Sequence, residues 1–532
     1  MKKRMLKIIA TVLSLVLVFM SVSLATSAEE AGKYPVVTGA EDFDLCEVMI
    51  NKSETVFLTR AEHNKDKYST LLASDDLIAY DEIDIMSALP EDTEYFEVVH
   101  YTVKDDLFVF VVFLYDLEVG FDENDQGYIE QVIYLGTQIV TTTDFVDYES
   151  YAFTINQDNP EVFWELENYG DFASFGYVGD TFVYANTDCI VTKETDLEVK
   201  GKGIYYTTTD FVNWKICYTP EVVLYSVPHE GNLVLPGIYS YYSIKYTVLK
   251  NSLVFDLIEL EIEEDPFGKI HEYTSLTLTY VTSNFKDYKN IFTSSDSLKY
   301  YSCSYFYLKG QPDSVFMLKE YNKASDGKGY MAIVSADIKS GTLKTVYGET
   351  SRNYMDVYAT EDGLYFNVWD EASGSYVYEF NGDLKYSKVL GMDSLEGYYG
   401  YVMNDKLYMR KGNEIYVFDD GQRSEYRFSP KQYEGYTLDK LFALESGAVA
   451  LAENTKTKET VLIDGIKKTG DADFDNKVNS GDALKILQDA TSLLTLSDEA
   501  RAVADVDENG ELNSNDALKV LQYSTGLILS LA

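Results

Sequence analysis

The sequence predicts a mainly β protein, a β-propeller-like array of about seven blades followed by a small all-α module. Short runs of β-branched and aromatic residues, separated by Gly, Asp and Asn turns, fill the chain to about residue 465. In the second half of this region the runs recur roughly every 40 residues. From Asp471 onward the composition changes to Ala, Leu, Lys and Asp, and one ten-residue phrase occurs twice. These observations favour two folded domains of different class.

The N-terminus predicts a secretory signal peptide over residues 1–28. Met1-Lys2-Lys3-Arg4 is positively charged and precedes an apolar run from Ile8 to Met20 and the small residues Ala25-Thr26-Ser27-Ala28. The alternative is a membrane anchor, but the run is shorter than the ~20 residues that a spanning helix needs. We therefore expect a secreted, extracellular protein with no membrane span in the mature chain.

The net charge limits the partners. With 88 acidic and 44 basic residues the formal charge is −44, which opposes binding to nucleic acid and to anionic lipid. So many carboxylates favour solubility, and no catalytic pair can be picked out by abundance alone.

Cysteine usage leaves two interpretations open. The chain contains Cys46, Cys189, Cys217 and Cys303. Cys189 and Cys217 are the favoured disulfide pair because both lie in neighbouring strand-like segments. Buried free thiols are an equally good interpretation, because four cysteines in so long a chain do not form a disulfide scaffold.

A polar phrase recurs three times in the first half of the array, at residues 141–148, 207–214 and 281–288. Its middle copy reads Thr-Thr-Thr-Asp-Phe-Val-Asn-Trp. Each copy ends an apolar strand, turns at Asp or Asn and closes on an aromatic residue, which predicts a repeated hairpin. The phrase resembles the aspartate-turn-aromatic repeats of sialidase-like and arabinanase-like propellers, families that include many glycosidases. We expect it to be structural rather than catalytic, since fold does not carry function with it.

About seven blades can be counted from the recurring turn and strand pattern. Their predicted starts are near Asp105, Gly179, Asn251, Phe316, Asp362, Asn404 and Ser446.

Catalytic motifs are absent from the strand-rich region. The four histidines are scattered, without His-Glu-x-x-His, and there is neither a Gly-x-Ser-x-Gly elbow nor a phosphate-binding loop. Glycoside hydrolysis remains open because its two carboxylates need no local motif. The tryptophans and many tyrosines suit stacking on sugar rings, although strand packing explains each of them as well: Trp164, Trp214 and Trp369. Whether the domain is an enzyme is left open. Non-catalytic binding of carbohydrate or protein is favoured over a glycoside hydrolase or polysaccharide lyase and over a structural spacer.

The duplicated phrase is Asn479-Ser480-Gly481-Asp482-Ala483-Leu484-Lys485-Ile486-Leu487-Gln488, and it returns 34 residues later with only Gly/Asn and Ile/Val exchanged. An acidic alternation precedes each copy. A twelve-residue calcium loop has oxygen ligands at positions 1, 3, 5, 7, 9 and 12, the one at position 7 being a backbone carbonyl. Counting from Asp471 and from Asp505 predicts two calcium ions, held by Asp471, Asp473, Asp475, Lys477, Asn479 and Asp482, and by Asp505, Asp507, Asn509, Glu511, Asn513 and Asp516.

Two positions depart from the usual loop. Position 12 is Asp rather than Glu, and position 6 is Gly510 in the second loop but Asn476 in the first. Asparagine tolerates the left-handed backbone that the sharp turn needs, so both loops are expected to form.

Each loop is expected to open into an amphipathic helix, with Ala483, Leu484, Ile486 and Leu487 and their counterparts 34 residues later as its apolar side chains. A helical stretch around Ser497 to Ala504 joins the two repeats. Because no helix precedes the first loop, the unit is a loop-helix repeated twice.

This module resembles the type I dockerins of cellulosomal proteins. The resemblance implies calcium-dependent folding and docking onto a cohesin module of a scaffoldin, so that the protein joins a complex that degrades plant polysaccharide. It also implies that the cohesin contacts are Ser480, Gly481, Leu487 and Gln488, and Ser514, Asn515, Leu521 and Gln522. The nearly identical halves imply docking in two orientations. We expect a signal peptide over 1–28, a propeller-like domain over 29–465, a linker over 466–470 and a dockerin over 471–532.

Overall fold

The computed structural model describes residues 43–51, 54–62, 69–74, 81–93, 95–121, 127–153, 174–194, 198–226, 229–230, 233–234, 238–264, 270–293, 298–323, 329–351, 355–370, 374–380, 386–392, 398–403, 405–419, 422–429, 432–444 and 447–531. The predicted signal peptide and Trp164 lie outside these ranges.

In the described part of the chain, strands predominate as far as Ile466. In the first half they are β1 (Phe43–Asn51), β2 (Glu54–Glu62), β3 (Ser69–Ser74), β4 (Asp81–Glu82), β5 (Tyr95–Lys104), β6 (Leu107–Phe121), β7 (Gly127–Thr142), β8 (Tyr148–Ala152), β9 (Ser174–Val178), β10 (Thr181–Glu194), β11 (Glu198–Thr208), β12 (Lys215–Tyr218), β13 (Val222–Ser226), β14 (His229–Glu230), β15 (Leu233–Val234), β16 (Ile238–Leu249), β17 (Ser252–Glu264), β18 (Ile270–Thr282) and β19 (Lys289–Thr293).

The second half continues with β20 (Leu298–Phe306), β21 (Ser314–Lys323), β22 (Gly329–Asp337), β23 (Leu343–Ser351), β24 (Met355–Ala359), β25 (Leu364–Asp370), β26 (Gly374–Phe380), β27 (Tyr386–Met392), β28 (Tyr398–Met403), β29 (Lys406–Lys411), β30 (Glu414–Asp419), β31 (Gln422–Arg427), β32 (Tyr436–Leu444), β33 (Gly447–Asn454) and β34 (Thr460–Ile466). Among the described residues the helices are the short 3-10 helix η1 (Ile85–Ala88), α2 (Ser480–Ala490), α3 (Asp498–Ala504) and α4 (Ser514–Ser524).

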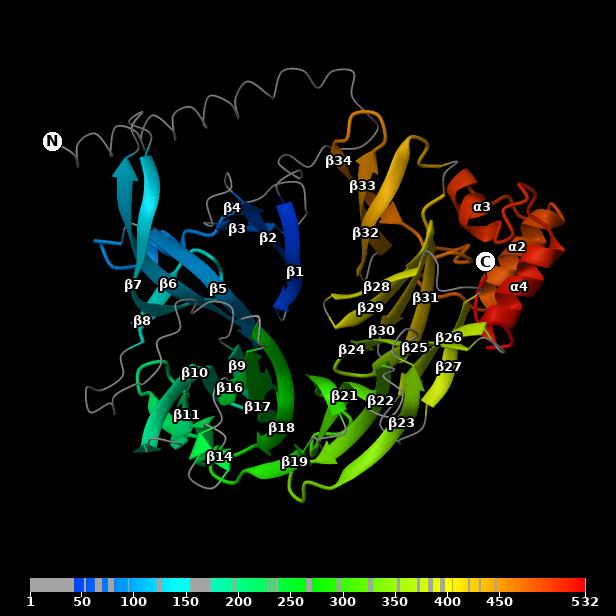
Figure 1. Ribbon diagram of the computed structural model, residues 1–532. Helices are drawn as coiled ribbons and strands as arrows, with labels where there is room; N and C mark the ends of the chain where they lie inside the picture. Colours follow the sequence, from blue (N-terminus) through cyan, green and yellow to red (C-terminus); the bar gives the residue numbers. More distant parts are fainter. Residues whose placement is uncertain are drawn as a thin grey trace.

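The strands form antiparallel sheets arranged around a centre, as in a propeller (Figure 1). Sheets β5–β8, β20–β23, β24–β27 and β28–β31 each have four strands in chain order, and β32–β34 has three. Two further units, β9–β12 and β16–β19, are joined through β13 into one nine-stranded sheet. Each of the seven predicted starts lies within two residues of the second strand of such a unit or inside it. The propeller-like array of seven units is therefore confirmed, and β1–β4 adds a four-stranded sheet that the count from sequence left out.

The cores of this array lie between neighbouring sheets. Side chains alternate across a strand, so Phe108, Phe110 and Val112 of β6 pack in one cluster with η1 and β5. Val109, Val111 and Phe113 face the other way and pack against Phe182 and Tyr184 of β10. Because both faces of these second strands are covered, their sequences are continuous apolar runs rather than alternating ones.

The three repeated phrases form the same hairpin turn after β7, β11 and β18. At each turn a phenylalanine has left-handed φ: Phe145 at 58°, Phe211 at 57° and Phe285 at 59°. In the middle copy Asp210 Oδ1 accepts hydrogen bonds from the backbone N–H groups of Val212 and Asn213, and Trp214 Nε1 donates to the carbonyl of Phe211 at 3.0 Å. The side chains of the phrase thus satisfy the backbone of their own turn, as the structural interpretation predicted.

The favoured disulfide between Cys189 and Cys217 is wrong, because Cys217 is a buried free thiol. Cys189 pairs in register with Gly203, whereas Cys217 pairs with Tyr205, so β11 lies between the two cysteines. Strands two apart are separated by about 9 to 10 Å, beyond the Cα separation that a disulfide spans. Cys303 is also a buried free thiol.

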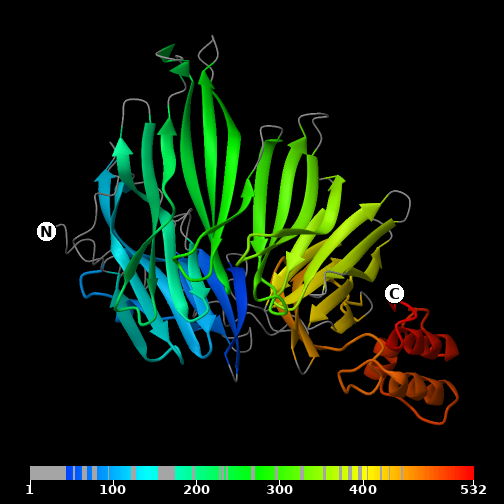
Figure 2. The ribbon, with the colours of Figure 1, turned by 90° about the horizontal axis from the view of Figure 1, so that it is seen from below.

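The C-terminal module is helical and lies at the outer side of the ring beside sheet β28–β31 (Figures 1 and 2). Its core joins the two repeats, with Ala483 and Ile486 of α2 packed against Ala517 and Val520 of α4. The predicted link helix is α3. Across the part of the chain that the structure describes, no helix is long and apolar enough to cross a membrane.

Candidate metal centre and docking face

The first acidic loop brings three of its predicted ligands together. Carboxylate oxygens of Asp471, Asp473 and Asp475 lie within 4.8 Å of one another. Asp471 also accepts hydrogen bonds from the backbone N–H groups of Asp475 and Asn476, at 3.2 and 2.9 Å, which curl the loop around it. Asn476 has a φ of 65°, the left-handed conformation expected at position 6.

The second loop also gathers three carboxylates, from positions 1, 3 and 12 rather than 1, 3 and 5. Oxygens of Asp505, Asp507 and Asp516 lie within 4.8 Å of one another. Asp505 Oδ2 accepts a 2.8 Å hydrogen bond from the N–H of Gly510, whose φ is 85°. The two loops thus share a left-handed residue at position 6 whose N–H donates to the carboxylate at position 1.

Asp482 and Asp516, at position 12, each tie a loop to the helix that follows it. Asp482 accepts from the N–H groups of Ala472, at 2.9 Å, and Asn479, at 2.8 Å. Asp516 makes the equivalent bonds to Val506 and Asn513, at 3.1 and 2.9 Å. Asn479 and Asn513 cap their helices through the side-chain oxygen, completing a capping box.

The electrostatics of both loops suit a cation. Burial, assisted by the neighbouring carboxylates of Asp473 and Asp471, raises the pKa of Asp482 to about 6. Burial likewise raises the pKa values of Asp471 and Asp516. Asp473 Oδ1 and Asp505 Oδ1 are buried without a hydrogen-bond partner, which is costly for an ionised oxygen. A hard divalent cation with oxygen ligands would satisfy these atoms.

The two main helices present apolar side chains to solvent on the surface away from their shared core. Leu487 is 40% exposed and its counterpart Leu521 is 41% exposed. Leu484 and Leu518, one turn earlier, are more exposed still. We call these four leucines the docking face. These leucines lie outside the core of the module and are accessible to a partner.

Residues 469–523 match the family model of the type I dockerin domain. This C-terminal module is a type I dockerin. A type I dockerin binds two calcium ions and the cohesin of a scaffoldin, and this module contains two acidic clusters that could hold metal ions. A type I dockerin implies docking onto cohesin in an extracellular cellulosome.

A search of the curated proteins found no match to the chain. Among solved structures, the chain resembles an acylaminoacyl peptidase of Pyrococcus horikoshii (11% identity, 71% of this chain and 52% of that one, TM-score 0.32). It also resembles dipeptidyl peptidase 4 of Porphyromonas gingivalis (11% identity, 82% of this chain and 62% of that one, TM-score 0.38). A third similar structure is the NanB sialidase of Streptococcus pneumoniae (8% identity, 77% of this chain and 88% of that one, TM-score 0.26). The chain spans about half of the first structure and about three fifths of the second. Scores this low say nothing about activity.

The structure gives the remaining predicted site residues specific surroundings. Lys477 and Glu511, predicted to contribute carbonyls, follow the sharp turns at Asn476 and Gly510. Asn509 Oδ1 accepts from the N–H of Glu511 at 2.8 Å. Six of the eight predicted cohesin contacts flank the docking face with partial or full exposure: Ser480, Gly481, Gln488, Ser514, Asn515 and Gln522.

Leu484 and Leu518 were not among the predicted contacts. The sequence grouped Ala483, Leu484, Ile486 and Leu487 as one apolar set, whereas the dockerin buries only Ala483 and Ile486. The signal was present in the spacing, because residues three apart share a helix face and Leu484 lies beside Leu487.

Proposed function

We propose that the propeller-like domain, residues 29–465, is the cargo that this dockerin delivers, and that it binds carbohydrate or protein in a complex degrading plant polysaccharide. The dockerin at residues 469–523 is the single observation that carries the proposal, because it attaches whatever precedes it to a scaffoldin. We further propose a linker over 466–470, a dockerin over 471–532 and the complete ligand sets predicted above.

The surroundings of candidate catalytic groups favour binding over catalysis. Asp144 and Asp210 use their carboxylates within their own turns. Burial lowers the pKa of His100 to about 4, and its ring stacks on Phe175, so at neutral pH it is an uncharged packing residue. Trp214 packs edge-on against Phe153 and Phe182, and its indole N–H donates to the carbonyl of Phe211 in the turn.

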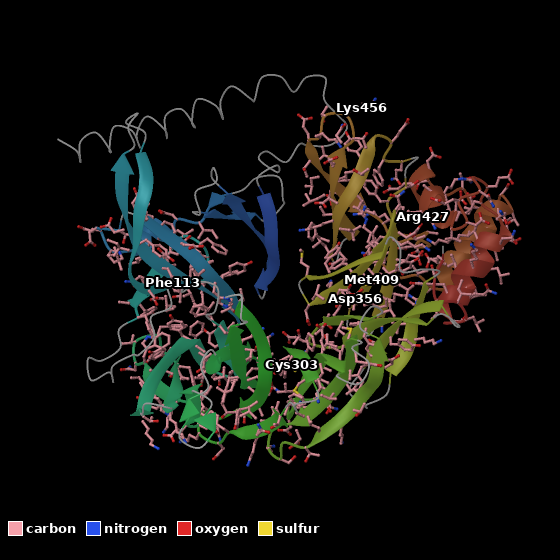
Figure 3. All side chains as sticks on the ribbon, in the orientation of Figure 1. Phe113, Cys303, Asp356, Met409, Arg427 and Lys456 are labelled. Atoms are coloured by element: carbon pink, nitrogen blue, oxygen red, sulfur yellow. The ribbon has the colours of Figure 1, made fainter. Side chains whose placement is uncertain are left out.

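One observation supports the alternative, that the domain is a glycoside hydrolase or polysaccharide lyase. Asp356 is exposed on β24, the inner strand of its sheet, and its side chain lies toward the centre of the ring (Figure 3). Glycoside hydrolysis needs a second carboxylate facing such a group.

A screen of the purified full chain against plant and microbial polysaccharides tests both functions. Retention without release of reducing sugar is expected. Release that disappears in Asp356→Asn would instead support the hydrolase. If no polysaccharide is retained and none releases reducing sugar, carbohydrate binding is contradicted. The search should then turn to protein ligands.

Calcium-dependent capture of a type I cohesin by the full chain tests the delivery role. We expect a stable complex in calcium and none in chelator. Complex formation that is unchanged in the presence of chelator would contradict the delivery role.

A further inference from the structure

The dockerin is not suspended on a free tether. β31 is an outer strand of its sheet, and the chain leaving β34 pairs with it. Lys468 forms an antiparallel bridge with Tyr426, and the N–H of Thr469 donates to the carbonyl of Glu425 at 2.8 Å. The predicted linker therefore follows the sheet up to the first calcium loop.

Glu425 joins β31 to the C-terminal tail of the dockerin. Its side chain is 1% exposed, and Oε2 accepts hydrogen bonds from the N–H of Leu531 at 3.0 Å and from Ser530 Oγ at 3.4 Å. Leu531 is completely buried in the dockerin core. A carboxylate buried between the two domains shows that water is excluded from this contact.

Arg427 joins β31 to the second calcium loop, and Figure 3 labels it where the sheet meets the helical module. Its Nη1 donates to the carbonyl of Asp505 at 3.3 Å and its Nη2 to that of Val506 at 3.1 Å. On the other side, Nε pairs with Glu414 of β30 at 2.7 Å. A planar guanidinium held by Glu414 thus fixes the backbone at position 1 of the loop.

Arg423 supplies a third contact. Its guanidinium lies 4.7 Å from the ring centroid of Tyr523 on α4, and its Nε is 3.3 Å from the Tyr523 hydroxyl. All three contacts are made by alternate residues of one strand, 423, 425 and 427, which point to the same side.

These contacts break the symmetry of the dockerin. Arg427 reaches the start of the second loop, and Arg423 reaches the helix that follows it. The first loop is contacted by the linker lysines, with Lys468 Nζ donating to the carbonyl of Asn476 at 2.8 Å. The docking face on α2 and α4 remains exposed despite the contact with the sheet.

We propose that strand β31 is a docking surface for the second repeat of the dockerin, which holds the second calcium loop in its ligand-binding shape while leaving the docking face free. Calcium binding to that loop and the order of the β31 backbone are then coupled, and the dockerin keeps one fixed orientation relative to the propeller. The inference does not depend on what the propeller binds.

Calcium titrations of the full chain, read by hydrogen exchange in peptides from each loop separately, test the proposal. Arg427→Gln should raise the calcium concentration that protects residues 505–516 by about tenfold, the effect of losing charge-assisted hydrogen bonds. Protection of residues 471–482 should change little, and residues 422–427 should exchange faster.

Glu414→Gln is the matched control, because it removes the ion pair within the sheet while Arg427 keeps its bonds to the loop. It should shift the second loop less than Arg427→Gln. If Arg427→Gln fails to fold, Arg423→Ala replaces it as the test variant. Hydrogen exchange in residues 422–427 and 505–516 should then become faster than in the wild type. Equal shifts in both loops, or no shift in either, would overturn the proposal.

Discussion

Glu425 and Leu531 are joined by a 3.0 Å hydrogen bond from the Leu531 N–H to Glu425 Oε2, in a contact buried between sheet and dockerin. Burial raises the pKa of Glu425 from 4.5 to about 7, although the hydrogen bond from Leu531 opposes the rise; the charge of Glu414 adds to it, and the charges of Arg427 and Arg423 oppose it. The attraction of the Glu425 carboxylate to Arg423 and Arg427 therefore does not offset the free-energy cost of removing that carboxylate from water.

The folded chain should consequently lose stability as Glu425 ionises. A raised carboxyl pKa means that the stabilisation is fully present below pH 4.5 and is lost as the pH rises through about 7. The loss approaches roughly 3 kcal/mol, at about 1.4 kcal/mol per pKa unit. Melting temperatures of the wild type and Glu425→Gln in saturating calcium, between pH 5 and 8, measure this. The variant should gain on the wild type as pH rises, and a constant difference would contradict the raised pKa.

Removing one calcium ligand from each loop should abolish docking. Asp471→Ala combined with Asp505→Ala deletes position 1 of each loop and should mimic a chelator, because the orphaned carboxylates then repel one another without a cation. Cohesin binding by calorimetry should be lost, while circular dichroism should retain the β signal. Docking of the double variant at wild-type affinity would show that the loops do not control the docking face.

Much of the dockerin was predictable because its chemistry is local. The ligand spacing, the left-handed Asn476 and the two helices follow from residues within twelve positions of one another. The Asp210 turn was predictable for the same reason. The cysteine pairing failed because the sequence does not say that β11 separates Cys189 from Cys217. The bond from Arg427 to Val506 joins residues far apart in the chain, and no periodicity signals it.

Backbone strain at position 6 should distinguish the two loops. Gly510 has a φ of 85° with nothing within 4 Å of the position a Cβ would take, so Gly510→Ala suffers strain without a clash. The cost is about 1 to 2 kcal/mol, or about 5- to 30-fold in the calcium affinity of the second loop. The control is Asn476→Gly, which relieves the same strain in the first loop and should leave its affinity unchanged or improved. Equal calorimetric titrations for Gly510→Ala and the wild type would contradict the strain.

The aspartate turns should affect stability and not ligand binding. Asp210→Ala removes the acceptor for Val212 and Asn213, so the melting temperature of the propeller should fall. Val212→Ala, at the exposed tip of the same turn, should change it little. The hydrogen bonds from Asn213 lower the pKa of Asp210 to about 2, so its stabilisation persists above pH 4 and fades only as the pH falls toward 2. If a polysaccharide ligand is found, loss of its binding in a folded Asp210→Ala would contradict the structural role.

The docking face should tolerate the loss of one half. Leu484 and Leu487 repeat as Leu518 and Leu521 with matching exposure, so either helix can present the same surface if docking occurs in two orientations. Leu484→Ala with Leu487→Ala should then weaken cohesin binding by only about twofold, the statistical value of one orientation. The corresponding change in α4 should do the same, and all four together should cost over about 100-fold, since each buried leucine contributes about 1.5 to 3 kcal/mol. Cohesin calorimetry measures each step. A large loss from one pair alone would show that the propeller, held beside the dockerin by β31, admits cohesin in one orientation.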